Sequence, residues 1–252
     1  MQVRDLGTGR LMVSGEFSDL AVHHHPAVQV TLGRTGPLTI TTDGVASHRC
    51  RLAVVGSGAR HAVRSEAGSG AVTVYFGLQT PQGAELNELS RTLGRPRGIW
   101  LVPDGVELAT ATIGLATHAD PRAATDFLVA ELCRRAEPDG RMPSVHPQLR
   151  QAIEVVANRV PDHVDVASVA GAVALSPDYL GRLCRQQAGV SLSAAIRWQR
   201  LVTAVTQLAD GVSVTDAAHR AGFADGSHAT RVCREMTGAA PRDFAQAIRA
   251  AI

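Results

Sequence analysis

Lysine is absent from this sequence, so all 25 basic side chains are arginines. A GC-rich genome is the simplest reason, but the bias has a chemical consequence, because a guanidinium group can hold phosphate or guanine through two hydrogen bonds at once. The formal net charge is only +2, and it is unevenly distributed: residues 1–140 carry 13 arginines and 14 acidic side chains, whereas residues 141–252 carry 12 arginines and 9 acidic side chains. The mildly basic C-terminal half fits a nucleic-acid-binding surface.

Further absences narrow the class of protein. The four cysteines form no CxxC pair, which argues against a zinc module and against a disulfide scaffold. No stretch approaches the roughly 20 apolar residues that a membrane-spanning helix needs. The N-terminal segment MQVRDLGTGR has no apolar run, so we expect no secretory signal. A reduced, cytoplasmic protein without a membrane partner is the expectation.

The first 80 residues have the pattern of strands and turns. Apolar and polar side chains alternate in residues 28–32, 38–41 and 72–76, and glycine-rich or proline-containing turns separate these runs, one of them at Asp43-Gly44. Alternation with period two is typical of strands with one buried face. The pattern predicts a small all-β barrel or sandwich.

Helical patterns follow the strands. Ala84–Leu93 and Pro121–Ala136 are the first two, and Phe127, Leu128 and Leu132 share one stripe of the second. That stripe could form a dimer seam or could pack on the β-domain. Residues 137–143 (EPDGRMP) are expected to be a linker. From Pro147 onward the breaks predict seven helices.

This helical part contains a sequence repeat: LGRLCRQQAGVS at Leu180–Ser191 and ATRVCREMTGAA at Ala229–Ala240. Internal repeats indicate repeated structural units. Each copy follows a short apolar stripe and a turn, and Ser176 and Asp225 stand where N-caps are expected. Each unit therefore has the pattern of a helix-turn-helix whose second helix buries a cysteine, Cys184 or Cys233.

A long helix is expected between the two units, over Ser191–Leu208. Eighteen residues at 1.5 Å each span about 27 Å, and successive major-groove faces on one side of B-DNA lie about 34 Å apart. Such a spacer suits two reading helices on one side of a duplex. A helical bundle that binds no DNA is the alternative interpretation.

The helical region resembles the AraC/XylS family of transcription regulators. The resemblance covers about residues 147–249, and its most specific parts are AGFADGSHATR (Ala221–Arg231) and TGAAPRDF (Thr237–Phe244). It implies two helix-turn-helix units, joined by a linker helix, that bind adjacent segments of the major groove. It also implies a homodimer.

The resemblance implies DNA-contacting positions in both units: Asp178, Gly181, Arg182 and Arg185 in the first, and Gly226, Ser227, His228, Thr230, Arg231 and Arg234 in the second. Arg182 and Arg231 are the expected base readers, since arginine pairs with O6 and N7 of guanine. Arg185 and Arg234 are expected to contact phosphates. The cysteines and Ala229 stand where the family usually has larger side chains.

A second resemblance concerns histidines in the N-terminal half. His23, His25, Gln29 and Gly36, followed by Gly58 and His61, have the spacing of the two cupin motifs, with Gln29 in place of the acid and Gly56 in place of the proline. Residues 23, 25 and 29 have the same parity on a strand and would point the same way. Three imidazoles and an amide oxygen could bind a divalent metal, or they could line a metal-free effector pocket.

Together these patterns predict an α+β multidomain chain. Residues 1–118 would form a cupin-like β-barrel with helices that senses an effector, residues 119–145 a helix and linker, and residues 146–252 an all-α DNA-binding domain. We expect a sequence-specific transcription regulator, not an enzyme, with double-stranded DNA, a small-molecule or metal effector and RNA polymerase as partners. The alternatives are a metal-dependent cupin enzyme with a helical appendage, and a module that binds another protein.

Overall fold

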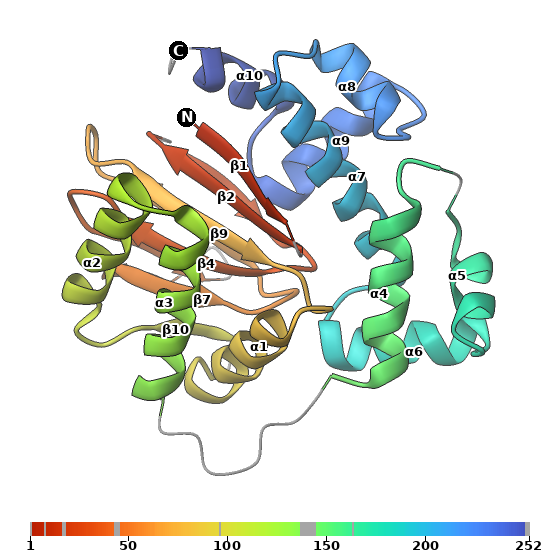
Figure 1. Ribbon diagram of the computed structural model, residues 1–252, viewed down its shortest axis with the longest axis horizontal. Helices are drawn as coiled ribbons and strands as arrows, with labels where there is room; N and C mark the ends of the chain where they lie inside the picture. Colours follow the sequence, from red (N-terminus) through yellow and green to blue (C-terminus); the bar gives the residue numbers. More distant parts are fainter. Residues whose placement is uncertain are drawn as a thin grey trace.

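The computed structural model describes residues 2–7, 9–16, 19–42, 46–95, 97–136, 145–162 and 164–249. The expected turn at Asp43-Gly44 and the expected linker at residues 137–143 lie outside these ranges. Within them, ten strands and three helices precede residue 137, and seven helices follow residue 144 (Figure 1).

The strands form two antiparallel sheets that face each other, as the β-rich prediction requires. The larger sheet has six strands in the order β1 (Gln2–Gly7), β2 (Arg10–Gly15), β9 (Ala71–Phe76), β4 (Val28–Gly33), β7 (Leu52–Val55) and β10 (Ile99–Leu101). The smaller sheet has the order β3 (Asp19–His23), β8 (His61–Ser65), β5 (Leu38–Thr42) and β6 (Ala46–Cys50). Strand β3 is therefore at an edge.

Strand β4 shows why the sequence alternates. Val28, Val30 and Leu32 belong to the apolar cluster on the helix-covered face of the larger sheet. Gln29 and Thr31 point to the opposite face, between the sheets, because successive side chains on a strand alternate. Every residue of β4 is buried, since both faces of the sheet are covered. The polar side chains of this strand are consequently interior groups that need partners.

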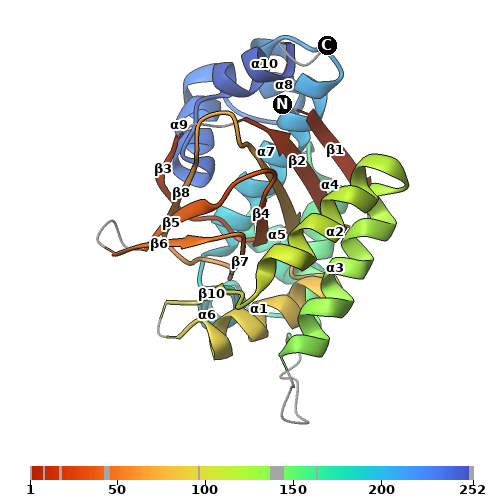
Figure 2. The same ribbon diagram turned by 90° about the vertical axis from the view of Figure 1, so that its left-hand side faces the viewer.

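Three helices cover the outer face of the larger sheet: α1 (Pro81–Leu93), α2 (Gly105–His118) and α3 (Pro121–Arg135). Figure 2 shows α2 and α3 side by side at the right, next to the sheet. The sequence patterns predicted α1 and α3 but missed α2, whose apolar side chains include the exposed Val106 and Leu115 and so form no clean stripe. Leu128 and Leu132 are fully buried against the chain's own core, whereas Phe127 is 36% exposed.

The seven predicted C-terminal helices are all present. They are α4 (Pro147–Arg159), α5 (Val166–Ala172), α6 (Pro177–Ala188), α7 (Leu192–Ala209), α8 (Val214–Arg220), α9 (Gly226–Thr237) and α10 (Pro241–Arg249). The expected caps are confirmed: the side chain of Ser176 accepts a hydrogen bond from the amide of Tyr179, and that of Asp225 accepts one from the amide of His228. The α7 helix has the 18 residues expected of the linker helix.

The helical half packs directly on the β-rich half. The α7 helix contacts β1, and α9 contacts β3. One apolar cluster runs without a break from the larger sheet into the second helix-turn-helix unit. The position of α7 and α9 against the sheets decides the surroundings of the histidines.

No helix among the described residues is long and apolar enough to cross a membrane.

Candidate DNA-binding surface and effector site

The α6 helix presents the predicted reading face of the first unit to solvent. Asp178, Arg182 and Arg185 are exposed and Gly181 is half-buried. The guanidinium carbon of Arg182 lies 5.8 Å from the ring centroid of the exposed Tyr179, close enough for a cation–π contact. Two arginines and an acid thus stand on one accessible stripe.

The α9 helix has the corresponding face, with Gly226, Ser227, Arg231 and Arg234 exposed. His228 and Thr230 are half-buried and already have partners. The ring of His228 packs edge-on against Phe223, with 5.4 Å between the centroids. The hydroxyl of Thr230 donates to the carbonyl of Gly226 at 2.8 Å. The exposed hydrogen-bonding groups of this face are therefore mainly those of Ser227 and the two arginines, with the ring nitrogens of the half-buried His228 beside them.

The two cysteines of the repeat are buried behind these faces. Burial raises the pKa of the Cys184 thiol to about 11 and that of Cys233 to about 12. A thiol with so high a pKa is a poor nucleophile and a poor metal ligand at neutral pH. Both side chains serve as small apolar groups of the core.

The histidine cluster lies where the cupin-like spacing predicted it. His23, His25, Gln29 and His61 are each at most 1% exposed. The ligand-type nitrogen atoms of the three histidines all lie within 4.8 Å of one another. Strands β3, β4 and β8 and the segment between β3 and β4 supply the four side chains. The structure therefore brings together all four residues of the predicted effector site.

The ring orientations are fixed by the backbone. The Nδ1 atoms of His23, His25 and His61 lie 2.7, 3.0 and 3.0 Å from the carbonyl oxygens of Ala21, Ala27 and Ala59. A carbonyl can only accept, so each Nδ1 carries the proton and donates it. Each Nε2 is then left with a lone pair. Histidines that bind metals are commonly held in this way.

Gln29 completes the set of converging acceptors. Its Oε1 lies 2.9 Å from Nε2 of His25 and 3.2 Å from Nε2 of His61, while its amide group donates to Thr31 at 2.7 Å. In this orientation the amide oxygen faces the lone pairs of two nitrogen atoms, which repel it. A cation bound between these atoms would remove the repulsion. Turning the amide over would instead let its NH₂ group donate to both imidazoles.

Protonation of the histidines does not supply this positive charge at neutral pH. Burial lowers the pKa of His23 to about 3 and that of His25 to about 4, and it holds the pKa of His61 well below its usual range. Nε2 of His23 is also buried and has no hydrogen-bond partner among the described residues. Three neutral imidazoles with convergent lone pairs form a donor set for a divalent metal.

The helical half closes over this cluster. The indole of Trp198, from α7, lies with its ring centroid 5.1 Å from that of His25 and 5.2 Å from that of Tyr75. The edge strand β3 meets the end of α9, where the amide of Ala21 donates to the carbonyl of Gly238 at 3.3 Å. A Cβ on Gly238 would come 3.0 Å from Nδ1 of His23.

The first unit is attached to the β-rich half in an equivalent way. Oγ of Ser57 lies 2.6 Å from the carbonyl oxygen of Ala188, and Nδ2 of Asn87 donates to the carbonyl of Gln187 at 3.3 Å. Gly189 packs against the backbone of Gly58. Gly189 and Gly238 occupy the same position of the sequence repeat, so both predicted recognition helices are anchored by their C-terminal ends. The segments of the β-rich half that hold them adjoin His61 and His23.

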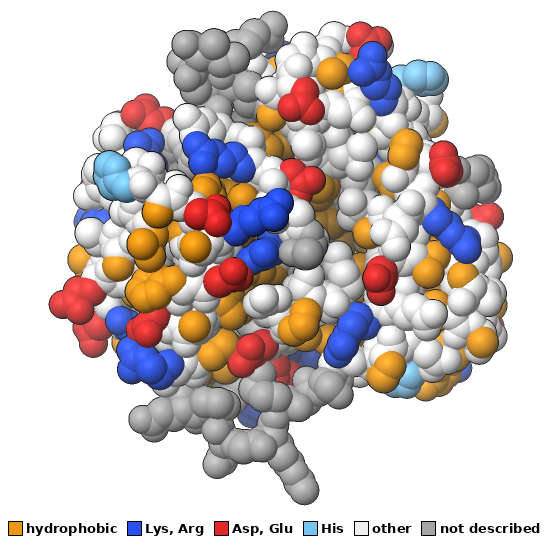
Figure 3. Space-filling model, viewed as in Figure 1, with side chains coloured by type: hydrophobic (Ala, Val, Ile, Leu, Met, Phe, Trp, Pro, Cys, Tyr) orange, Lys and Arg blue, Asp and Glu red, His pale blue; other side chains and the backbone are white. Residues whose placement is uncertain are grey.

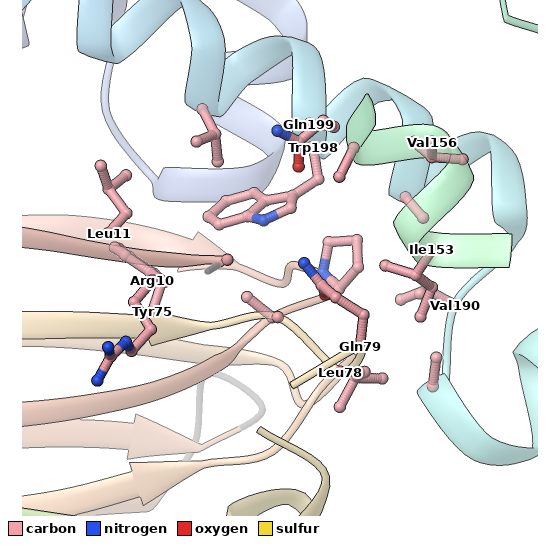
Figure 4. Close-up of a pocket in the computed structure, with 18 of the residues that line it drawn as sticks. Arg10, Leu11, Tyr75, Leu78, Gln79, Ile153, Val156, Val190, Trp198 and Gln199 are labelled. Atoms are coloured by element: carbon pink, nitrogen blue, oxygen red, sulfur yellow. The ribbon is translucent and has the colours of Figure 1, made fainter. Parts of the chain in front are cut away.

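A separate cavity lies between the two halves, beside Trp198. Its volume is about 180 Å³, and its walls come from the β-domain, α4 and α7 (Figure 4). Leu11, Tyr75, Ile153 and Val190 are among the residues that make it largely apolar. Trp198 stands between this cavity and the histidines. The sequence patterns did not identify the cavity, because its walls come from segments far apart in the chain.

Comparison with known proteins decides what the helical part is. Residues 169–247 match a family model described as a helix-turn-helix domain. This part of the chain is a helix-turn-helix domain. The arabinose operon regulatory protein of Salmonella typhimurium is 35% identical over 107 residues, which are 40% of this chain and 38% of that protein. Its Escherichia coli counterpart is 32% identical over 127 residues, which are 48% and 43% of the two chains.

The resemblance to AraC/XylS regulators is thereby confirmed for the C-terminal region. The chain spans about two fifths of the length of the curated relatives it matches. Over nearly the whole chain, the fold is that of ToxT from Vibrio cholerae. An apo variant of ToxT aligns with a TM-score of 0.67 and 14% identity, over 97% of this chain and all of that one. Wild-type ToxT with a bound unsaturated fatty acid aligns with a TM-score of 0.61 and 12% identity, over 97% of each.

Proposed function

We propose that the protein is a sequence-specific DNA-binding transcription regulator of AraC/XylS type. The observation that carries the proposal is the pair of capped helices α6 and α9, each with two exposed arginines on its outer face. Arg182 and Arg231 would read bases, and Arg185 and Arg234 would hold phosphates. The proposal keeps the domain limits expected from the sequence: a sensor in residues 1–118, a connecting helix and linker in 119–145, and a DNA-binding domain in 146–252.

The histidine cluster is the proposed effector site. The three Nε2 atoms and the amide oxygen of Gln29 would hold a divalent ion of the zinc, nickel or cobalt class, which imidazole ligands suit. All four ligands are neutral, so hard ions such as Mg²⁺, which prefer carboxylates, would bind poorly. When bound, the metal supplies positive charge to a buried site that protons cannot charge at neutral pH. Gln29 then keeps the orientation that it has in this structure.

Control of DNA binding would pass through the two anchored glycines. His23 adjoins the contact with Gly238, and His61 follows the loop that contacts Gly189. An ion that fixes His23 and His61 together therefore fixes both anchor points and, with them, the spacing of α6 and α9. An effector acts only through a difference in affinity between two states, and docked and undocked recognition helices provide such states.

The cavity beside Trp198 supports a second candidate effector, a small apolar molecule. Its walls are largely apolar, and Trp198 would transmit its occupancy to His25. Bound ligands are a property of ToxT, the structural neighbour. At about 180 Å³ the cavity is smaller than most drug-sized sites, so only a small or narrow ligand would fit without movement of α7.

The remaining partners follow from the function. A homodimer would suit paired half-sites, and its seam would use the exposed side chains on α2 and α3, since Leu128 and Leu132 are buried. Hydrophobic side chains gather on that side of the molecule, at the left of Figure 3. RNA polymerase is the expected protein partner, and the cytoplasm the expected compartment. The alternative, a metal-dependent cupin enzyme, requires a turnover that His61→Ala abolishes and Arg231→Ala leaves intact.

Selection from a pool of random duplexes tests the proposal. Wild-type protein, with and without Zn²⁺, should enrich a motif with two separately read segments about one helical turn apart. Arg182→Ala should erase one segment and Arg231→Ala the other. Failure of the wild type to enrich any motif under either condition would contradict the proposal. Calorimetric titration with Zn²⁺ should give one site, lost in His61→Asn and kept in the control His48→Asn.

A further inference from the structure

The surface next to the first recognition helix is strongly basic and belongs mostly to the sensor half. An open hollow of about 690 Å³ is lined by Arg91, Arg95 and Arg97 from the end of α1 and the loop after it, and by Arg185 from α6. Among the described residues of its wall, Glu88 is the only one with an acidic side chain. These described wall residues therefore carry a net charge of +3, although residues 1–140 together carry a net charge of −1.

These arginines are exposed, and most have no acidic partner. In the part of the chain that the structure describes, the side chains of Arg91, Arg95 and Arg185 form no hydrogen bond or ion pair. Arg97 is held by Thr42, whose hydroxyl accepts its hydrogen bond at 2.6 Å. Arginine at the end of a helix is favoured by the helix dipole, which would account for Arg91. The dipole does not account for the convergence of Arg95 and Arg97 with an arginine of another domain.

The hollow continues the proposed DNA-reading face. Asp178, Arg182 and Arg185 stand on one stripe of α6, at positions i, i+4 and i+7. Arg185 is the last residue of this stripe, and it also lines the hollow. The docking contacts of Ser57 and Asn87 with the end of α6 keep the sensor arginines in place beside it. A duplex lying along α6 would carry its backbone phosphates past this surface.

We infer that the sensor domain forms part of the DNA-binding surface: Arg91 and Arg95, together with Arg185, bind backbone phosphates of the DNA that flanks the segment read by α6. This inference rests on the proposed function. Double-stranded DNA carries one negative charge per 1.7 Å of its axis, so several phosphates pass within reach of such a surface. The contacts add affinity without sequence preference, because phosphates are the same at every step.

The experiment compares two duplexes that contain the selected motif, one ending at the motif and one extended by about one helical turn on each side. The variant is Arg91→Ala/Arg95→Ala. The control, Arg4→Ala/Arg34→Ala, removes the same charge from exposed positions around another hollow of the β-domain. Affinities are measured by fluorescence anisotropy at several salt concentrations, and thermal unfolding checks that both variants are folded.

The wild type and the control should bind the extended duplex more tightly than the short one. The affinity of the variant for the extended duplex should fall about tenfold, and its affinity for the short duplex should change little. A plot of the logarithm of the binding constant against the logarithm of the salt concentration should have a slope that is shallower by about 1.8, since each phosphate contact contributes about 0.9. Equal affinities for variant and control on the extended duplex, or an equal loss on both duplexes, would overturn the inference while leaving the regulator in place. A wild type that binds no duplex would overturn both.

Discussion

The indole ring of Trp198 lies 5.1 Å from the imidazole ring of His25, centroid to centroid, and the two residues belong to different halves of the protein. Trp198 is on the linker helix that joins the two helix-turn-helix units. His25 is in the buried cluster that we propose as the effector site. This contact gives the proposed effector site a direct connection to α7, the helix between the two proposed recognition helices.

Zn²⁺ binding should therefore change the fluorescence of Trp198. The chain has one other tryptophan, Trp100 in β10, which packs in the cluster on the helix-covered face of the sheet. A Zn²⁺ titration of the wild type should give a saturable change in emission, and Trp198→Phe should abolish it while calorimetry still detects metal binding. An unchanged response in Trp198→Phe would show that the linker helix does not sense the cluster.

Gly238→Ala should loosen the second unit from the sensor domain. A Cβ at Gly238 would come 2.4 Å from the carbonyl oxygen of Ala21, and the glycine has a φ of +73°. A left-handed conformation itself costs a non-glycine residue about 1–2 kcal/mol. Gly211→Ala is the matched control, because Gly211 has a φ of +83° and nothing within 4 Å of its added Cβ.

Urea unfolding compares the two substitutions. Gly238→Ala should lower the free energy of unfolding by at least about 1 kcal/mol more than Gly211→Ala does, because only the former adds a collision to the left-handed strain. It should also make the fluorescence of Trp198 insensitive to Zn²⁺. Equal losses of stability in the two variants would mean that the contact between Gly238 and β3 contributes nothing to the free energy of unfolding.

The stability of the metal-free protein should fall as the pH is lowered from about 6.5 to about 4. Burial depresses the pKa values of His23 and His25 in the folded state to about 3 and about 4, whereas unfolded imidazoles titrate near 6.5. Between these values the unfolded chain binds more protons, so acid favours unfolding. Between pH 6.5 and pH 5 each neutral imidazole should account for about 2 kcal/mol.

Urea unfolding in the presence of a chelator, at a series of pH values, measures this dependence. His61→Asn, which removes one buried imidazole, should give a shallower decline than the wild type. The exposed His48 supplies the control, since His48→Asn should leave the decline unchanged. A free energy of unfolding that stays constant from pH 6.5 to pH 5 would contradict the buried, neutral state of the cluster.

Loss of a single reading arginine should relax specificity at particular positions. Arg182→Ala or Arg231→Ala should weaken binding to the selected motif by about 1–3 kcal/mol and bring the affinity closer to that for scrambled DNA. Arg185→Ala and Arg234→Ala should instead weaken binding to both duplexes to a similar extent, since phosphate contacts carry no base information. The reverse pattern would exchange the roles that we assign within each pair.

Local chemistry made much of the structure predictable from the sequence. Ser176 and Asp225 mark helix starts because their side chains satisfy amides that the helix leaves free, and the structure has both caps. The alternation around Gln29 predicted a strand with polar groups on its inner face. The resemblance to the cupin motifs brought His23, His25 and His61 into one prediction. The parity argument was wrong in its premise, because residues 23–29 do not form one strand: His23 ends β3, His25 lies in the connecting segment and Gln29 is in β4 of the other sheet.

The missing parts depend on contacts between distant segments. Trp198 lies on a helix whose pattern predicts only a spacer, and nothing in its neighbourhood indicates that it covers a histidine 173 positions earlier in the chain. Ser57 and Asn87 are ordinary loop and helix residues until α6 docks on them. Helix α2 was missed because part of its apolar surface is exposed, and Leu128 and Leu132 turned out to serve the chain's own core.

The central claim is that α6 and α9 read DNA sequence, and fluorescence anisotropy of the full chain tests it most directly. The measurement uses the selected motif and a scrambled duplex of equal length, at two salt concentrations, with Zn²⁺ present. The account predicts tight binding to the motif, much weaker binding to the scrambled duplex, and affinities for both that fall steeply with salt. Equal affinity for the two duplexes at both salt concentrations would contradict it.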